Sequence, residues 1–379
     1  MNLPESLKTT AWPSTLVTLL ALSGATGCAG PEDDQEAEGV PVTPGGATRG
    51  LPEAIGALGV IADVNGRGDS FTPQCTGVLI GPQTILTSVR NAFCLPTLEH
   101  PAGFAIGGNG RAPLRVLPVV DGDLAPIRAT PRIADDDQMP SLAVVYLKDP
   151  VPDIAPLALG TLTVAQVDAR FRSAGYAYER HQNTDLLDVI RESRVVTLRS
   201  LSGPYFPLIF AGHFRSFRKW WWGSIEPVEY PGLEPAIRAY YRGVGPDPFG
   251  AGGPAILDDG YEALVEKSQE DTSFGPLASN LLIRRNPSGV FVVYGVASAP
   301  LDSPDHHHDI YETFGPDTRT FLAGALSWKD PCATRRQAGG YCDGATARVC
   351  GADHKTQRSH NCAAFGVSCA ITAEQPVCR

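Results

Sequence analysis

Three consecutive histidines flanked by aspartates form a dense group of metal-ligating side chains, Asp305-His-His-His-Asp309. Imidazole and carboxylate groups are suitable ligands for a transition metal. Adjacent residues of a strand point to opposite faces, however, so three consecutive histidines rarely chelate one ion. The run therefore favours a solvent-exposed loop with a modest pH response over a metal site. We expect no metal and no other cofactor.

A basic and aromatic run, Phe217-Arg-Lys-Trp-Trp-Trp-Gly223, offers a different chemistry. Trp220–Trp222 and the neighbouring cations could bind a protein partner, a glycan or lipid headgroups. In a strand, alternation would bury at least one tryptophan, so partial core packing with one exposed face explains the run equally well. The sequence leaves both interpretations open.

The segment from Cys75 to Arg90 reads Cys-Thr-Gly-Val-Leu-Ile-Gly-Pro-Gln-Thr-Ile-Leu-Thr-Ser-Val-Arg. It resembles the segment of trypsin-like serine proteases that carries the catalytic histidine, Cys-x-Gly-x-Leu-Ile-x-Pro-x-x-Ile/Val-Leu-Thr-Ala-Ala-His, with no gap in the spacing. Arg90 stands at the position of that histidine. An arginine keeps its proton in a protein and cannot act as a general base. The resemblance therefore implies the fold of these proteases and argues against their activity.

Two further motifs carry the same resemblance. Ser141-Leu-Ala-Val-Val-Tyr-Leu147 matches the strand that begins with the orienting aspartate, and Ser141 takes the place of that residue. Phe249-Gly-Ala-Gly-Gly-Pro254 matches Gly-Asp-Ser-Gly-Gly-Pro, and Ala251 takes the place of the nucleophilic serine. The three catalytic groups of these proteases act as a unit. The resemblance thus implies a protein without catalytic residues.

Positions around the expected cleft are altered as well. The resemblance puts the oxyanion-hole donors at Phe249 and Ala251, and the bulk of Phe249, in place of a glycine, changes that loop. The base of the specificity pocket becomes Gly245, so a preference for Lys or Arg substrates has no basis. Ser298, which follows Gly295-Val-Ala, matches the substrate-binding strand.

Short β-forming runs separated by turns dominate the middle of the chain, and the whole chain of 379 residues is rich in Gly (40) and Pro (33). Gly77–Ile80 and Thr84–Ser88 flank Gly81-Pro82 and predict a hairpin, and Leu142–Leu147 and Val290–Ser298 predict strands. Asp317–Trp328 predicts a helix with Asp317 as N-cap. We expect an all-β fold, a chymotrypsin-like double β-barrel with a C-terminal helix, followed by a small disulfide-rich module. The expected boundaries are 1–27 (signal peptide), 28–50 (linker), 51–328 (protease-like domain) and 329–379 (cysteine-rich module).

The cysteines support export. The chain has nine: Cys28, Cys75, Cys94, Cys332, Cys342, Cys350, Cys362, Cys369 and Cys378. If the first is lipidated and the next two pair, the last six can form three bridges, whose pairing the sequence does not specify. A Cys75–Cys94 bridge would be similar to a bridge of the resembling family. The stretch Cys342–Cys350 predicts a tight hairpin.

The N-terminal residues predict export. Lys8, the apolar run Leu16–Leu22 and Ala25-Thr-Gly-Cys28 resemble the signal and cleavage box of a bacterial lipoprotein, with diacylglycerol on Cys28. The apolar run is too short to span a bilayer. Residues 29–50 read as an acidic, Gly- and Pro-rich tether. An ordinary cleaved signal is the alternative. We expect the bacterial outer membrane or cell surface, otherwise a secreted or periplasmic location.

The net charge of −10 argues against a nucleic-acid partner. Our hypothesis is a monomeric, non-catalytic trypsin-like serine protease homologue of the cell envelope whose cleft binds a protein or peptide. An extended peptide could add to an exposed strand edge there. One alternative is an active serine-type endopeptidase with relocated catalytic residues. Another is a structural envelope lipoprotein that binds through its cysteine-rich tail.

Overall fold

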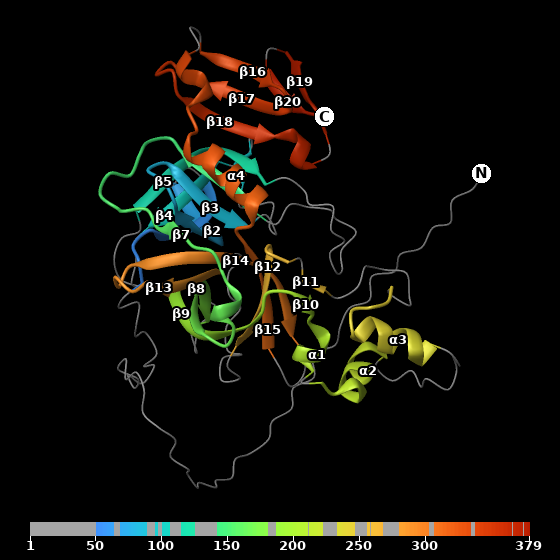
Figure 1. The fold of residues 1–379 in the computed structure, drawn as a ribbon. Helices are drawn as coiled ribbons and strands as arrows, with labels where there is room; N and C mark the ends of the chain where they lie inside the picture. The colour runs from blue at the N-terminus through green and yellow to red at the C-terminus, as the bar shows by residue number, and fades with distance from the viewer. Residues whose placement is uncertain are drawn as a thin grey trace, which may run out of the picture. The chain divides into compact units, whose positions relative to one another are not determined.

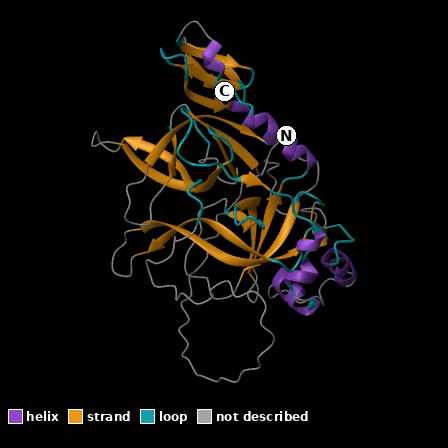
Figure 2. Cartoon of the chain, turned by 60° about the vertical axis from the view of Figure 1, so that its left-hand side comes forward, coloured by secondary structure: helices purple, strands orange, loops and turns teal. Residues whose placement is uncertain are grey.

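The computed structural model is drawn in Figure 1. It describes residues 51–63, 69–88, 95–97, 101–106, 115–125, 142–180, 187–210, 212–222, 233–246, 256–257, 259–267, 280–302, 307–334, 338–365, 367–373 and 375–379. Strands dominate these residues, and the helices lie outside the sheets (Figure 2). No helix within these ranges has the length and apolar character that crossing a membrane requires.

The first barrel is closed, with the strand order β1-β2-β3-β6-β5-β4. Its strands are β1 (Ile55–Asp63), β2 (Asp69–Leu79), β3 (Thr84–Ser88), β4 (Ala102–Ile106), β5 (Arg115–Leu124) and β6 (Leu142–Leu147). All neighbouring strands are antiparallel. The predicted hairpin is confirmed, because Val78 and Leu79 of β2 pair with Leu86 and Ile85 of β3.

The second barrel has the order β8-β9-β12-β15-β14-β13 and closes through the pairing of β13 with β8. Its strands are β8 (Arg170–Arg180), β9 (Leu187–Ser200), β12 (Glu262–Lys267), β13 (Leu281–Arg285), β14 (Phe291–Asp302) and β15 (His307–Thr313). The short β7 (Ala158–Leu159) adds to β14 in parallel. Counted along each barrel, the order is first, second, third, sixth, fifth and fourth in both. This repeated order is the chymotrypsin-like double barrel that the sequence predicted.

Strand β13 lies between two parts of the core. Leu281 and Ile283 belong to the large cluster that also holds the interior of the first barrel, whereas Leu282 packs with Phe171 and Tyr311 inside the second barrel. Since successive side chains of a strand point to opposite faces, one strand lines both cores. The cluster of the first barrel therefore extends onto one face of β13, while the interior of the second barrel forms a separate cluster on the other face.

A polar junction also joins the barrels. The Thr76 hydroxyl of β2 accepts the Tyr176 N–H of β8 at 3.0 Å, and the Thr87 hydroxyl of β3 donates to the Thr76 carbonyl at 2.8 Å. Thr76 and Thr87 are both fully buried. These bonds satisfy groups that burial would otherwise leave unpaired.

A helical insertion, residues 205–246, separates β9 from β12. It contains α1 (Phe206–Ile209), α2 (Phe214–Trp222) and α3 (Leu233–Tyr241). Its two ends meet in a two-stranded sheet, where β10 (Gly203–Pro204) pairs with β11 (Ile256–Leu257). The insertion has its own aromatic core, which continues into Leu264 of β12 and Ile310 of β15.

The predicted C-terminal helix is confirmed as α4 (Pro316–Leu326), but the expected N-cap is wrong. Gly315 is the N-cap and Pro316 takes the first helical position, where its missing N–H costs nothing. Asp317 lies in the first turn and accepts the Tyr261 hydroxyl at 3.1 Å.

The C-terminal module, residues 329–379, contains a three-stranded sheet and a hairpin. The strands are β16 (Gly339–Asp343), β17 (Thr346–Cys350), β18 (Thr356–Asn361), β19 (Cys369–Thr372) and β20 (Gln375–Cys378). The hairpin predicted at Cys342–Cys350 is β16–β17. The disulfides are Cys332–Cys350, Cys342–Cys369 and Cys362–Cys378, so the hairpin's two cysteines bond to different partners.

The module packs on the first barrel through β18 and β5. Asp121 of β5 accepts the Arg348 guanidinium and, at 2.5 Å, the Ser359 hydroxyl. Asp121 is 1% exposed and Arg348 is 7% exposed. At the periphery Lys148 pairs with Asp353 at 3.1 Å, and Lys355 pairs with Asp149. The ring of Tyr146 stacks on Trp328, with centroids 4.5 Å apart.

Candidate functional site

The three residues expected in place of the catalytic triad, Arg90, Ser141 and Ala251, lie outside the described residues, as does Phe249. The strands around the first two are described. β3 ends at Ser88 and β6 begins at Leu142, and these two residues are cross-strand partners. The chain segments that contain Arg90 and Ser141 therefore depart from neighbouring positions at one edge of the first barrel.

The segment with Ala251 is tied to a different part of the fold. It connects α3 to β11, and β11 pairs with β10 at the base of the helical insertion. The strand that bears Ser298 is β14, and its hairpin partner is β13. The strand after Gly252-Gly253-Pro254 is therefore not the one that pairs with the Ser298 strand. This arrangement could not be read from the Gly-Gly-Pro motif alone.

Ser298 lies at an irregularity of β14. The register with β15 shifts between Ala297 and Ala299, so Ser298 is the bulged residue. Its hydroxyl donates to the Ile310 carbonyl at 3.2 Å. A bulge of this kind bends a strand and alters its twist.

Beyond the bulge, no described strand pairs with one side of β14. β13 pairs with β14 up to Val296, and the Ala297 N–H donates to the Asn280 carbonyl at 2.7 Å. Among the described residues, Ser298–Asp302 pair with β15 alone. Their outward backbone groups can therefore accept another strand.

Gly245, the residue expected at the base of the specificity pocket, lies just after α3. A Cβ added there would come within 2.8 Å of the Ala239 Cβ in that helix. Gly245 thus lies against the helical insertion, whereas Ser298 lies in β14 and bonds to β15. The sequence motif had assigned both to one pocket.

The histidine run does not form the expected loop. His307–Asp309 begin β15, while Asp305 and His306 lie outside the described residues. His308 is 2% exposed, and Asp309 accepts the Lys267 ammonium at 2.8 Å. The loop expectation is wrong for these three residues, because pairing with β14 and β12 takes the run into the sheet. No group of metal-ligating side chains of the required size occurs in the described part of the chain.

The Trp220–Trp222 run ends α2, so the strand alternation that we applied to it is wrong. Helical spacing governs this segment, and Phe217 is its fully buried position. The run has no β-forming partner segment next to it in sequence. The abundance of aromatic residues favoured a strand on propensity, and packing within the insertion overrode it.

Cys75 is fully buried in β2 and is disulfide-bonded. Cys94, its expected partner, and Cys28, the expected lipidation site, lie outside the described residues. The remaining six cysteines form the three bridges of the C-terminal module.

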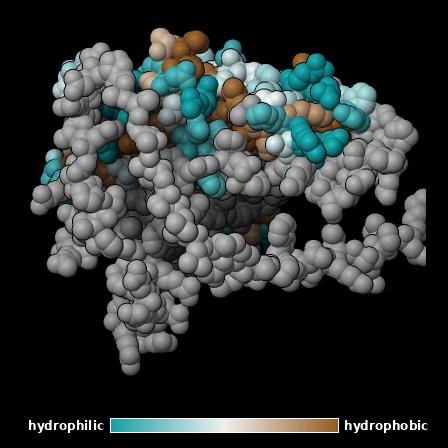
Figure 3. Space-filling view, turned by 90° about the horizontal axis from the view of Figure 1, so that it is seen from below, coloured by the Kyte–Doolittle hydropathy of each residue, from teal (hydrophilic) through white to brown (hydrophobic). Residues whose placement is uncertain are grey.

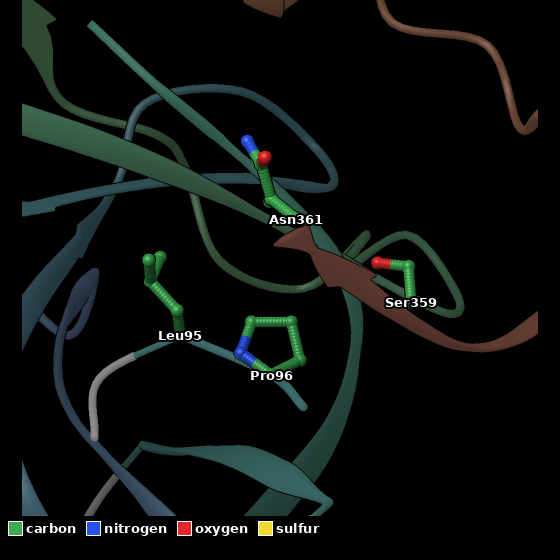
Figure 4. A pocket seen from close by; sticks show the side chains of 5 residues that line it. Leu95, Pro96, Ser359 and Asn361 are labelled. Atoms are coloured by element: carbon green, nitrogen blue, oxygen red, sulfur yellow. The ribbon is translucent and has the colours of Figure 1, made fainter. Parts of the chain in front are cut away.

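Sequence reasoning missed the buried polar network of Asp121, Arg348 and Ser359. Burial raises the pKa of Asp121, while Arg348 and Ser359 act in the opposite direction. A small pocket lies beside this network, lined by Leu95, Pro96, Gly122, Ser359 and Asn361 (Figure 4). Gly245 and Ser298, which are the described residues expected at the cleft, do not line it. Arg348 stands in an ordinary β-run, Thr-Ala-Arg-Val-Cys, so no local signal marks it as a buried cation.

A second buried polar pair lies inside the second barrel. The Tyr311 hydroxyl donates to the Ser173 hydroxyl at 2.7 Å, and burial raises the pKa of Tyr311. This bond satisfies a phenol inside an apolar interior. It gives Ser173 of β8 a structural role inside the second barrel.

Comparison with known proteins gave structural likeness only. No protein-family model and no curated protein matches the sequence. Among solved structures, neuropsin, a serine protease expressed in the limbic system of mouse brain, has a TM-score of 0.41 and 14% identity, over 73% of this chain and 95% of its own. GrC has a TM-score of 0.42 and 12% identity, with the same coverage. The fold assignment rests on the strand order, which is the same in both barrels.

Proposed function

We propose that this protein is a non-catalytic trypsin-like serine protease homologue that binds an extended peptide, and that it is exported and lipid-anchored through Cys28. The observation that carries the proposal is the set of inert residues, Arg90, Ser141 and Ala251, at three separate motif positions of a double-barrel chain. Arg90 cannot accept a proton, Ser141 has no carboxylate, and Ala251 has no nucleophilic atom. One replacement could reflect a displaced motif, but three have no such explanation.

The side of β14 with which no described strand pairs supports the binding part of the proposal. Residues Ser298–Asp302 present backbone donors and acceptors along one side. A peptide that pairs with such an edge gains main-chain hydrogen bonds without any catalytic group. Loss of catalysis therefore leaves a usable recognition surface.

The first experiment tests inactivity. We expect the purified full chain neither to cleave casein nor to react with a fluorophosphonate probe, with trypsin as the positive control. A labelled serine would support the endopeptidase alternative and would identify the relocated nucleophile by mass spectrometry. The proposal would be contradicted if the labelling of a serine depended on a histidine whose nitrogen lies within about 3 Å of the serine oxygen.

The second experiment tests peptide binding at the edge. A peptide captured from an envelope extract is added back to the full chain, and amide hydrogen exchange is followed. We expect slower exchange in residues 298–302 and little change in residues 281–285, which are already paired within the barrel. Protection confined to the C-terminal module would instead favour the tail-binding alternative.

A further inference from the structure

The helical insertion carries a charge pattern opposite to that of the whole protein. The full chain has a net charge of −10, yet residues 205–246 carry a net charge of +2 with His neutral. The basic residues of this segment are Arg215, Arg218, Lys219, Arg238 and Arg242, and its acidic residues are Glu226, Glu229 and Glu234. Such an asymmetry cannot come from a uniformly solvated acidic surface, and it indicates a local surface for anionic partners.

The basic side chains of the insertion face outward. Arg215 of α2 and Arg238 of α3 are exposed, as is Arg242 just beyond α3, and Arg218 is half-buried. The guanidinium of Arg238 lies 4.2 Å from the centroid of the Phe214 ring, so this exposed cation of α3 lies against the first residue of α2. The only acidic side chain described in the insertion is Glu234, which pairs with Arg238 at 3.1 Å.

A rigid aromatic core holds this surface. The Phe217 ring packs against Phe206 and Tyr241, with centroids 4.9 Å and 4.8 Å apart, and Phe214 packs against Tyr241 at 5.4 Å. Phe217 is fully buried. The β10–β11 pairing closes the base of the insertion. The arginines are therefore displayed by packed helices, not by a loop that must be ordered on binding.

Exposed apolar groups accompany the basic ones. Leu208 of α1 is 44% exposed and Val244, after α3, is 74% exposed. Figure 3 views the molecule from below, and on its coloured part hydrophobic residues lie among hydrophilic ones. The insertion thus combines cations, exposed aliphatic groups and a tryptophan-rich helix end, which is the composition of segments that lie in a membrane interface.

We propose that the helical insertion, through Arg215, Arg218, Arg238 and Arg242, binds the surface of an anionic phospholipid bilayer. Charge complementarity with the lipid phosphates supplies the attraction, while Leu208 and Val244 contact the boundary between headgroups and acyl chains. The insertion then acts as a second membrane contact beside a lipid on Cys28. The inference does not depend on the inactivity of the cleft.

The test uses the full chain with Cys28→Ser, so that no acyl chain can anchor it, and vesicles of phosphatidylcholine with or without phosphatidylglycerol. We expect co-sedimentation with the phosphatidylglycerol vesicles alone, weakening as the salt concentration rises above about 0.1 M. Arg215→Glu with Arg242→Glu should lower the vesicle affinity at least about tenfold. The matched control, Arg172→Glu with Arg285→Glu, reverses two exposed arginines of the second barrel and should bind like the parent.

Three results would overturn the inference. The first is equal binding to both kinds of vesicle, and the second is no binding to the anionic vesicles. The third is a loss of vesicle affinity in the control variant as large as that in Arg215→Glu with Arg242→Glu. Tight binding of polyglutamate without lipid would show an acidic polypeptide to be the partner instead of a membrane. If the charge reversals unfold the insertion, Arg215→Gln with Arg242→Gln removes the same charges more gently. If the protein does not bind anionic vesicles, the peptide-binding proposal still stands, because amide hydrogen exchange at β14 tests it separately.

Discussion

Asp121 shows how one residue can connect two parts of the chain. Its carboxylate is almost fully buried on β5, and its partners Arg348 and Ser359 come from the C-terminal module. A buried ion pair adds little stability relative to apolar residues, but it becomes costly when one partner is removed. The network therefore connects the C-terminal module to the first barrel through buried polar contacts.

At this scale we predict that Arg348→Met lowers the free energy of unfolding by about 3–5 kcal/mol, because Asp121 loses its cation. The double variant with Asp121→Asn should recover part of this loss. Chemical denaturation of the purified chain measures both. As a control, Lys355→Met breaks the exposed pair with Asp149 and should cost at most about 1 kcal/mol. Equal losses for the two single variants would contradict the role of burial.

The pH dependence follows from the raised pKa of Asp121. A carboxyl whose pKa is higher in the folded state than in the unfolded one binds more protons when folded, so acidification favours folding across that interval. Relative to Asp121→Asn, the parent should gain unfolding free energy as the pH falls from 7 towards the usual Asp range, about 4. Denaturant titrations at several pH values test the sign. An opposite trend would mean that Arg348, not burial, controls the folded pKa.

At the scale of elements, sequence patterns served well where one residue type sets the backbone. Gly81-Pro82 set the β2–β3 hairpin, and the apolar runs at β6 and β14 appear as strands. The sequence patterns failed where tertiary packing determines the secondary structure. The run before Gly223 became helix α2, and the histidines joined β15. Aromatic residues favour strands, but such propensities are weak, so tertiary contacts determined the conformation of both runs.

The aromatic core of the insertion gives an element-scale prediction. Phe217→Ala removes a fully buried ring that contacts Phe206 and Tyr241, and should cost about 3–5 kcal/mol of local stability. Amide exchange should accelerate in α1–α3 and remain slow in β13 and β8. The half-buried Phe214→Ala, as a milder comparison, should have a smaller effect. Acceleration spread evenly over both barrels would show that the insertion is not a separate cooperative unit.

At the scale of the whole molecule, the two barrels depend on each other. The apolar cluster of the first barrel extends onto one face of β13, and a polar junction at Thr76 joins the two barrels. The C-terminal module adds a third dependence through Asp121. Deleting residues 329–379 would therefore expose that carboxylate and destabilise the first barrel. A better test of the tail-binding alternative is Ile371→Asp, because Ile371 is 51% exposed in the module.

Gly175 tests the barrel junction. A Cβ at this position would come within 2.2 Å of the Asn280 Oδ1 and 2.7 Å of the Thr76 Oγ1. We predict that Gly175→Ala costs about 1–3 kcal/mol, since the junction must move to accommodate it. Gly324→Ala is the control, because nothing lies within 4 Å of its added Cβ in α4. That change should stabilise the protein by about 0.5–1 kcal/mol, and thermal unfolding of both variants measures the contrast.

The sequence by itself determined the fold class, because turn residues, β-forming runs and motif spacing act locally and repeat along the chain. The assignment of Arg90, Ser141 and Ala251 to the positions of the catalytic groups also comes from the sequence, and it stays a prediction because these residues lie outside the described ones. Tertiary structure alone decided the disulfide pairing, the entry of the histidines into β15, and the packing of the helical insertion between β9 and β12. It alone brought Arg348 to Asp121, 227 residues apart in sequence. Such contacts depend on which surfaces meet when the chain is packed, and no local pattern encodes that meeting.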